Sequence, residues 1–129
     1  MLDTNAYSAL MADRGRVADI VRSADMVLLS AVVLGELLFG FRNGTRYNEN
    51  RTQLDTFLSR RFVQTIEVTL DTAERFGLIA AQLRRRGTPI PTNDVWIAAH
   101  AMESGGHLLS FDRHFEVVEG LLWRHIGSE

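Results

Sequence analysis

The sequence contains no cysteine, and this absence limits the chemistry that its 129 residues can perform. A disulfide-stabilised scaffold, a thiolate zinc site and a cysteine nucleophile are all excluded, and a chain without disulfides suits a reducing compartment. There is also no apolar run of about 18 residues, and no basic segment followed by an apolar one at the N-terminus. We therefore expect no contact with a membrane and a cytoplasmic location.

Lysine is absent too, so that all 14 basic residues are arginine. A phosphate-loop lysine, a Schiff-base lysine and the lysine of a receiver domain are thereby excluded. Arginine binds phosphate through planar, bidentate contacts, which suits a nucleic-acid partner, although codon bias in a GC-rich genome explains the composition equally well. The formal net charge of -2 favours neither interpretation.

The remaining composition is that of an ordinary globular protein. Hydrophobic residues make up 46% of the sequence, and the mean hydropathy is -0.04. A chain of this length can bury a substantial core but is too short for two typical domains. We therefore predict a single domain over residues 1–129.

Periodicity and capping residues predict alternating helices and strands. Ser30 is a plausible N-cap after a short apolar run, and Gly44 provides a stop signal for the helix that follows. A capping-box spacing from Asp71 to Glu74 predicts another helix start, with Asp71 as the cap. The expected helices cover residues 6–11, 15–23, 31–41, 45–61, 71–86 and 93–104, and the expected strands 26–29, 62–68, 107–111 and 121–126. This alternation is typical of a three-layer α/β/α sandwich with a central parallel sheet.

Four acidic residues lie just after expected strands or near the starts of expected helices. Asp3 ends the first apolar residues, Asp112 ends the strand at 107–111, Glu36 lies less than two turns into the helix after Ser30, and Asp94 opens a helix. Ligands of open parallel sheets bind beyond the carboxyl ends of the strands, so these side chains are expected to converge there. Clustered carboxylates repel one another unless a cation is bound, and oxygen ligands favour Mg²⁺ or Mn²⁺.

Each acid also has a simpler interpretation. Asp3 and Asp94 could be helix caps, and Asp112 could be a turn residue. Glu36 is harder to explain structurally, because its helix is rich in apolar residues and an acid there needs a partner or a site. The shared placement of the four acids, more than any one of them, indicates a metal site.

Four segments of the chain resemble the PIN-domain ribonucleases, and more closely the VapC toxins of bacterial toxin–antitoxin pairs. In chain order they are MLDTN at 1–5, SAVVLGELLFG at 30–40, TNDVWIAAHA at 92–101 and LSFDRHF at 109–115. The resemblance implies a magnesium-dependent endoribonuclease that leaves a 5′-phosphate and a 3′-hydroxyl. It also implies an RNA substrate, a cognate antitoxin and a homodimer.

The resemblance assigns roles to individual residues. The family's four acids fall on Asp3, Glu36, Asp94 and Asp112, the residues already indicated by their placement. Asp3 and Asp94 would hold Mg²⁺, or Mn²⁺ as a substitute, while Glu36 and Asp112 would act directly or through water. The family's small polar site residues fall on Thr4, Asn5 and Ser30, which are expected to support the carboxylates or the phosphate.

Two features depart from the family pattern. Only Met1 and Leu2 precede Asp3, where relatives usually carry a longer apolar segment, and residues 45–61 contain no family motif and are interpreted as variable surface. The four histidines show no paired ligand spacing and are predicted to be structural. Apolar residues of the helix after Ser30, including Leu37 and Phe39, exceed what one buried face needs and are expected to serve the homodimer.

Two other functions fit some of the residues. A haloacid-dehalogenase-type phosphatase would require a second aspartate two residues after the first, where this chain has Asn5. A catalytically silent PIN-like module that only binds RNA or protein remains the alternative to the nuclease, although the presence of all four acids argues against loss of activity.

Overall fold

The computed structural model describes residues 1–127, and its centre is a set of parallel strands. Strand β1 (Val27–Ser30) pairs with β2 (Val63–Ile66), and β3 (Leu108–Ser110) pairs with β4 (Trp123–His125), both in parallel. The expected parallel sheet is confirmed.

The N-terminal segment joins the two pairs of strands. The Leu2 amide donates to the Leu28 carbonyl at 3.1 Å, and the Leu109 amide donates to the Met1 carbonyl at 2.9 Å. Leu2 also forms a parallel bridge with Leu109. The short apolar segment before Asp3 is thus long enough to lie between β1 and β3, with the order β2, β1, residues 1–3, β3, β4.

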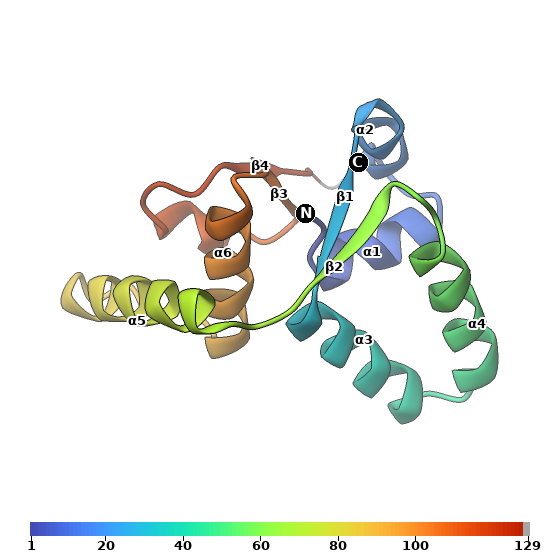
Figure 1. Ribbon diagram of the computed structural model, residues 1–129, viewed down its shortest axis with the longest axis horizontal. Helices are drawn as coiled ribbons and strands as arrows, with labels where there is room; N and C mark the ends of the chain where they lie inside the picture. Colours follow the sequence, from blue (N-terminus) through green and yellow to red (C-terminus); the bar gives the residue numbers. More distant parts are fainter. Residues whose placement is uncertain (128–129) are drawn as a thin grey trace.

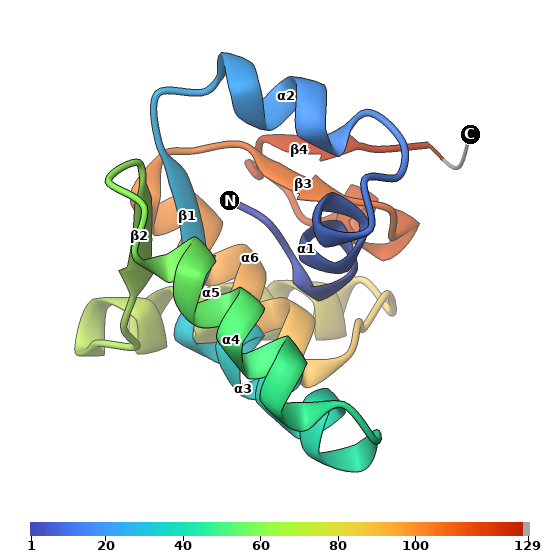
Figure 2. The same cartoon turned by 90° about the vertical axis from the view of Figure 1, so that its right-hand side faces the viewer.

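Helices cover both sides of these strands (Figures 1 and 2). In Figure 1, α5 and α6 lie on one side and α1, α3 and α4 on the other, as expected for an α/β/α sandwich. The helices are α1 (Thr4–Met11), α2 (Val17–Ser23), α3 (Ala31–Asn43), α4 (Tyr47–Leu58), α5 (Leu70–Arg85) and α6 (Thr92–Ser104), with a 3₁₀ helix η1 (Arg113–Val117) before β4. None of the described helices is both long and apolar enough to cross a membrane.

The core is built where the apolar periodicity predicts it. Leu29, Leu108, Ile97 and Phe115 are almost completely buried. Leu54 and Phe57 of α4 are buried as well, so the segment without a family motif contributes an amphipathic helix to the core.

The predicted helices are present, with ends that differ from the predicted ones by up to three residues, but the predicted cap of α5 is wrong. Ser30 caps α3 by accepting a 3.0 Å hydrogen bond from the Val32 amide, and α3 ends at Gly44 as expected. For α5 the cap is Thr69, not Asp71, because the Thr69 and Thr72 side chains exchange hydrogen bonds with each other's backbone amides. Asp71 lies inside the first turn, where its charge favours the positive end of the helix dipole.

Candidate active site

Asp3 is fixed at the point where the N-terminal segment passes into α1. One carboxylate oxygen accepts a 2.9 Å hydrogen bond from the Ala6 amide, and the other accepts a hydrogen bond from the Ser110 hydroxyl at the end of β3. Asp3 is therefore a helix cap as well as a candidate site residue. Ser110 is completely buried, so this pair links the acid rigidly to the carboxyl end of the sheet.

Glu36 reaches the same edge of the sheet from α3. Its two oxygens accept hydrogen bonds from the Thr4 hydroxyl at 2.5 Å and from the Asn93 amide at 3.2 Å. Neither donor carries a positive charge, so Glu36 is oriented without being neutralised. Glu36 lies among apolar residues of α3 and was therefore expected to need a partner. Thr4 of α1 and Asn93 of α6 are its partners.

Asp94 and Asp112 approach each other around a histidine. The Nε2 atom of His114 lies 3.2 Å from an Asp94 oxygen and in close contact with an Asp112 oxygen. This nitrogen atom is buried, and it forms a hydrogen bond with neither carboxylate. One ligand atom from each of these three residues lies within 4.8 Å of the others, a spacing that could accommodate a metal ion.

The sequence also allowed Asp94 to be a helix cap and Asp112 to be a turn residue, and the structure answers these two questions differently. Helix α6 begins after Pro91 without a side-chain cap, so Asp94 is not a cap. Asp112 does cap η1, because its side chain accepts a 3.1 Å hydrogen bond from the His114 amide. The same turn brings the His114 ring back towards Asp112 and Asp94.

Burial and mutual repulsion raise the pKa values of two of these acids. Loss of hydration is the main cause for Asp94, whose pKa rises to about 6, and Asp112, Glu36 and Asp3 raise it further while His114 lowers it. The pKa of Asp3 is also raised, chiefly by burial, although its hydrogen bonds from Ser110 and Ala6 oppose the change. Among residues 1–127, no arginine ion pair reaches any of the four acids.

The three small polar residues occupy different positions. Thr4 bonds directly to Glu36, whereas Asn5 is exposed and its side chain has no hydrogen bond to any other residue within 1–127. The Ser30 hydroxyl lies 2.7 Å from His100 Nδ1 and also accepts from the Val32 amide. The expectation that Ser30 supports a carboxylate or the phosphate is therefore not met by its hydrogen bonds.

The reason lies in the hydrogen-bonding capacity of the buried His100. Its Nε2 is 3.1 Å from the Glu67 carbonyl, which can only accept, so Nε2 carries a proton. In the neutral ring Nδ1 then accepts the one proton of the Ser30 hydroxyl, and none is left for an acid. His100 is structural, as predicted.

His114 is the candidate-site residue that sequence reasoning missed, because the structure places its ring beside Asp94 and Asp112. A lone histidine has no paired spacing that would identify it. Its position in the sequence, two residues after Asp112, could have identified it. Asp112 caps the turn that follows, and this turn places the His114 ring beside the same carboxylates.

Comparisons with known proteins agree with this geometry. The PIN domain family model matches residues 1–121. The chain is 32% identical over 126 residues to Ribonuclease VapC2 of Haemophilus influenzae, covering 94% of this chain and 92% of that one. It is 29% identical to the tRNA(fMet)-specific endonuclease VapC of Shigella flexneri, with 94% and 92% covered.

Solved structures share the fold closely. VapBC-1 from nontypeable Haemophilus influenzae matches with a TM-score of 0.85 and 26% identity, over 97% of this chain and 96% of that chain. DNA-bound VapBC from Salmonella typhimurium matches with a TM-score of 0.86, 25% identity and the same two coverages. On its family match, its sequence relatives and its fold, the chain belongs to the PIN-domain family, among the VapC ribonucleases.

Proposed function

We propose that this chain is a Mg²⁺-dependent endoribonuclease and the toxin of a type II toxin–antitoxin pair. One observation carries the proposal: Asp3, Glu36, Asp94 and Asp112 come from four separate segments to the carboxyl ends of the strands, and within residues 1–127 no arginine forms an ion pair with any of them. The names of the relatives support the same activity, since they are ribonucleases and a tRNA(fMet)-specific endonuclease.

The residues present fit a divalent ion. Asp94, Asp112 and His114 offer ligand atoms within 4.8 Å of one another, and the His114 Nε2 is buried without a hydrogen bond. The pKa of Asp94 is raised chiefly by burial and further by the neighbouring carboxylates, and a bound cation would favour the ionised form. When bound, Mg²⁺ or Mn²⁺ would polarise a phosphodiester oxygen and favour the ionisation of water.

The chain's own residues then position the reacting groups. Asp3, fixed by Ser110 and Ala6, and Asp94 would hold the ion, with Asp112 and His114 completing its ligands. Glu36, held by Thr4 and Asn93, would orient the attacking water. Thr4 thereby acts as a positioning residue.

Cleavage of total RNA tests this function. Wild type should cut RNA with Mg²⁺ and should be inactive with excess EDTA, leaving products with a 5′-phosphate and a 3′-hydroxyl. Asp71→Asn removes an exposed acid of α5 and is a matched control for Asp94→Asn. Cleavage that persists in EDTA, or that Asp94→Asn leaves intact, would contradict the proposal, whereas RNA binding without cleavage would favour the silent module.

The partner is proposed from the relatives. Similar structures are complexes named VapBC, so we propose that a cognate antitoxin binds this chain, and that both act in the cytoplasm. We also propose a homodimer, with Phe39 of α3 in its interface because its side chain is 71% exposed. Leu37 is buried in the core and is not available for that role. Light scattering that shows only a monomer at every concentration would contradict the homodimer.

A further inference from the structure

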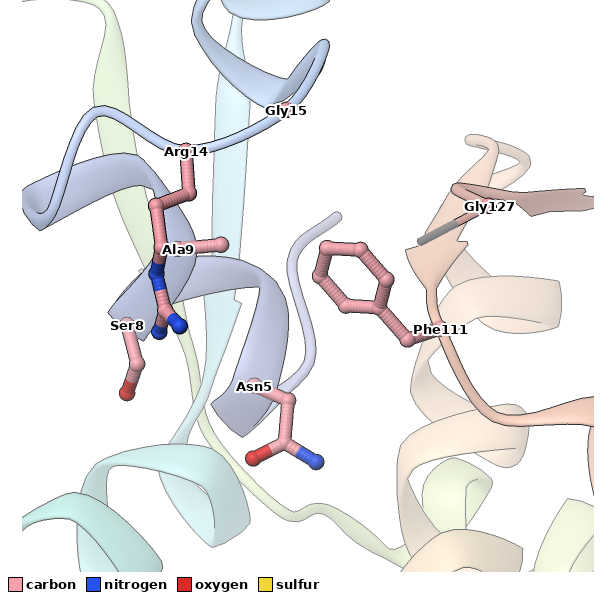
Figure 3. Close-up of a pocket in the computed structure, with 7 residues that line it drawn as sticks. All are labelled: Asn5, Ser8, Ala9, Arg14, Gly15, Phe111 and Gly127. Carbon is pink, nitrogen blue, oxygen red and sulfur yellow. The ribbon is translucent and has the colours of Figure 1, made fainter. Parts of the chain in front are cut away.

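A cavity of about 360 Å³ lies between α1 and the end of β3, in the size range of ligand pockets. Asn5, Ser8, Arg14 and Phe111 line it (Figure 3). Two of its residues adjoin site acids along the chain, because Asn5 follows Asp3 by two residues and Phe111 directly precedes Asp112. The cavity thus adjoins two of the site acids along the chain, although none of the four acids lines it.

Three side chains that line the cavity have polar or aromatic groups without a partner among the described residues. Within residues 1–127, no acid forms an ion pair with Arg14, and no other group hydrogen-bonds the Asn5 side chain. The Phe111 side chain is half-buried and has no aromatic partner among the described residues. Figure 3 shows its ring facing the side of α1, with the Asn5 amide below and the Arg14 guanidinium beside Ser8.

Arg14 is held in place by the way α1 ends. The Arg14 amide donates to the Ala9 carbonyl at 2.9 Å, and the Asp13 amide donates to the Leu10 carbonyl at 3.1 Å. Asp13 has a left-handed backbone with φ of 52°, so this is a Schellman motif with aspartate in the position usually taken by glycine. The motif fixes the backbone of Arg14 at the cavity.

We infer that this cavity binds one base of the RNA substrate beside the cleaved bond. Phe111 provides a stacking surface, the Asn5 amide offers both a donor and an acceptor to the base edge, and Arg14 binds the adjoining phosphate. An aromatic face with an amide and one cation favours a nucleotide over an apolar peptide segment. The inference rests on the proposed function, because it assigns the cavity to the same substrate.

Binding of short RNA tests the subsite separately from cleavage. The probes are fluorescent heptanucleotides of A, of U and of C, and an abasic strand of the same length. They are titrated by fluorescence anisotropy against the Asp94→Asn protein, which should not cut them. A stacked base contributes about 5- to 160-fold in affinity, so at least one base-bearing probe should bind at least about 5-fold more tightly than the abasic strand.

A second substitution then locates the effect. Adding Phe111→Leu should reduce this ratio to below about 2-fold, whereas adding Phe62→Leu, an exposed phenylalanine of the region before β2, should preserve it. An unchanged Mn²⁺-induced rise in melting temperature in the single variant Phe111→Leu would show that the neighbouring Asp112 is undisturbed.

Equal binding of all probes, or an unchanged ratio in Phe111→Leu, would overturn the subsite and leave the cavity as a surface for a protein. Base-dependent binding with no cleavage of RNA by wild type would support the subsite while contradicting the nuclease.

Discussion

Two polar clusters sit at the carboxyl edge of the sheet, and they differ in how their hydrogen bonds and charges are satisfied. In the first, Ser30, His100 and the Glu67 carbonyl pair with one another, and both side chains are fully buried. In the second, carboxylates meet around His114 with no arginine ion pair among residues 1–127. A buried cluster that satisfies itself stabilises the fold, whereas one with unbalanced charge is arranged for a ligand from outside.

The largest expected difference between the clusters is in catalysis. Asp94→Asn removes a proposed metal ligand but little volume, and should lower kcat for RNA cleavage by at least about 100-fold, more than the loss of an outer-shell partner. Asp3→Asn and Glu36→Gln should have comparable effects. Ser30→Ala should change kcat by less than about 10-fold, because its hydroxyl bonds His100 and no acid. The rates are measured below the melting temperature of each variant. If Ser30→Ala were as inactive as Asp94→Asn, the proposed difference between the two clusters would be wrong.

We expect Ser30→Ala to lower the free energy of unfolding more than Asp94→Asn does, which is the opposite of their order in catalysis. Ser30→Ala removes the cap of α3 and leaves a buried nitrogen of His100 unsatisfied, which should cost about 2 kcal/mol in the free energy of unfolding. Asp94→Asn should cost nothing in metal-free protein, because it relieves repulsion. Urea denaturation in EDTA measures both, and a larger loss for Asp94→Asn would mean that its carboxylate stabilises the fold.

The pH dependence can sharpen the comparison further. Burial raises the pKa of folded Asp94 to about 6 from its ordinary value of 3.8, so the folded state favours the protonated form. This stabilisation is complete below pH 3.8 and is lost as the pH rises through 6, a change of at most about 3 kcal/mol. Without metal, the stability of Asp94→Asn relative to wild type should therefore increase by about 1–2 kcal/mol between pH 4 and pH 7. A constant difference in the free energy of unfolding across this range would contradict the raised pKa.

The smallest predicted effect concerns the corrected start of α5. Thr69→Ala removes the capping hydroxyl and should destabilise the protein by about 1 kcal/mol. Asp71→Ala removes only a dipole interaction and should change stability by no more than about 0.5 kcal/mol. Thermal denaturation of the two variants in the same buffer checks the assignment, which a larger effect of Asp71→Ala would contradict.

Local signals in the sequence predicted most of the fold. The polar cap at Ser30 and the stop at Gly44 each depend on neighbours within a turn or two of helix. At α5 Thr69 caps the helix instead of the predicted Asp71, and the Thr72 hydroxyl also donates to Glu103, 31 residues away, a contact that local spacing does not reveal.

Only part of the candidate site could be predicted from the sequence, namely the acids whose position relative to strand ends and helix starts is visible there. Asp3 and Asp112 could be placed by the rule that ligands bind beyond parallel strands, and Asp94 by its position in the first turn of a helix. Ser30 and His114 could not, because their partners are chosen in three dimensions. His100 lies 70 residues from Ser30, and the role of His114 depends on a turn that Asp112 itself caps.

The melting temperature with and without Mn²⁺ tests the metal site most directly. An ion that binds only the folded state stabilises it by about 2.7 kcal/mol at a hundredfold excess over Kd. For a domain of this size, that corresponds to a rise of about 5 °C or more. Wild type should show this rise and Asp94→Asn a much smaller one, starting from an equal or higher melting temperature in EDTA. An equal rise in both proteins would place the ion elsewhere and contradict the assignment of the four acids as a metal site.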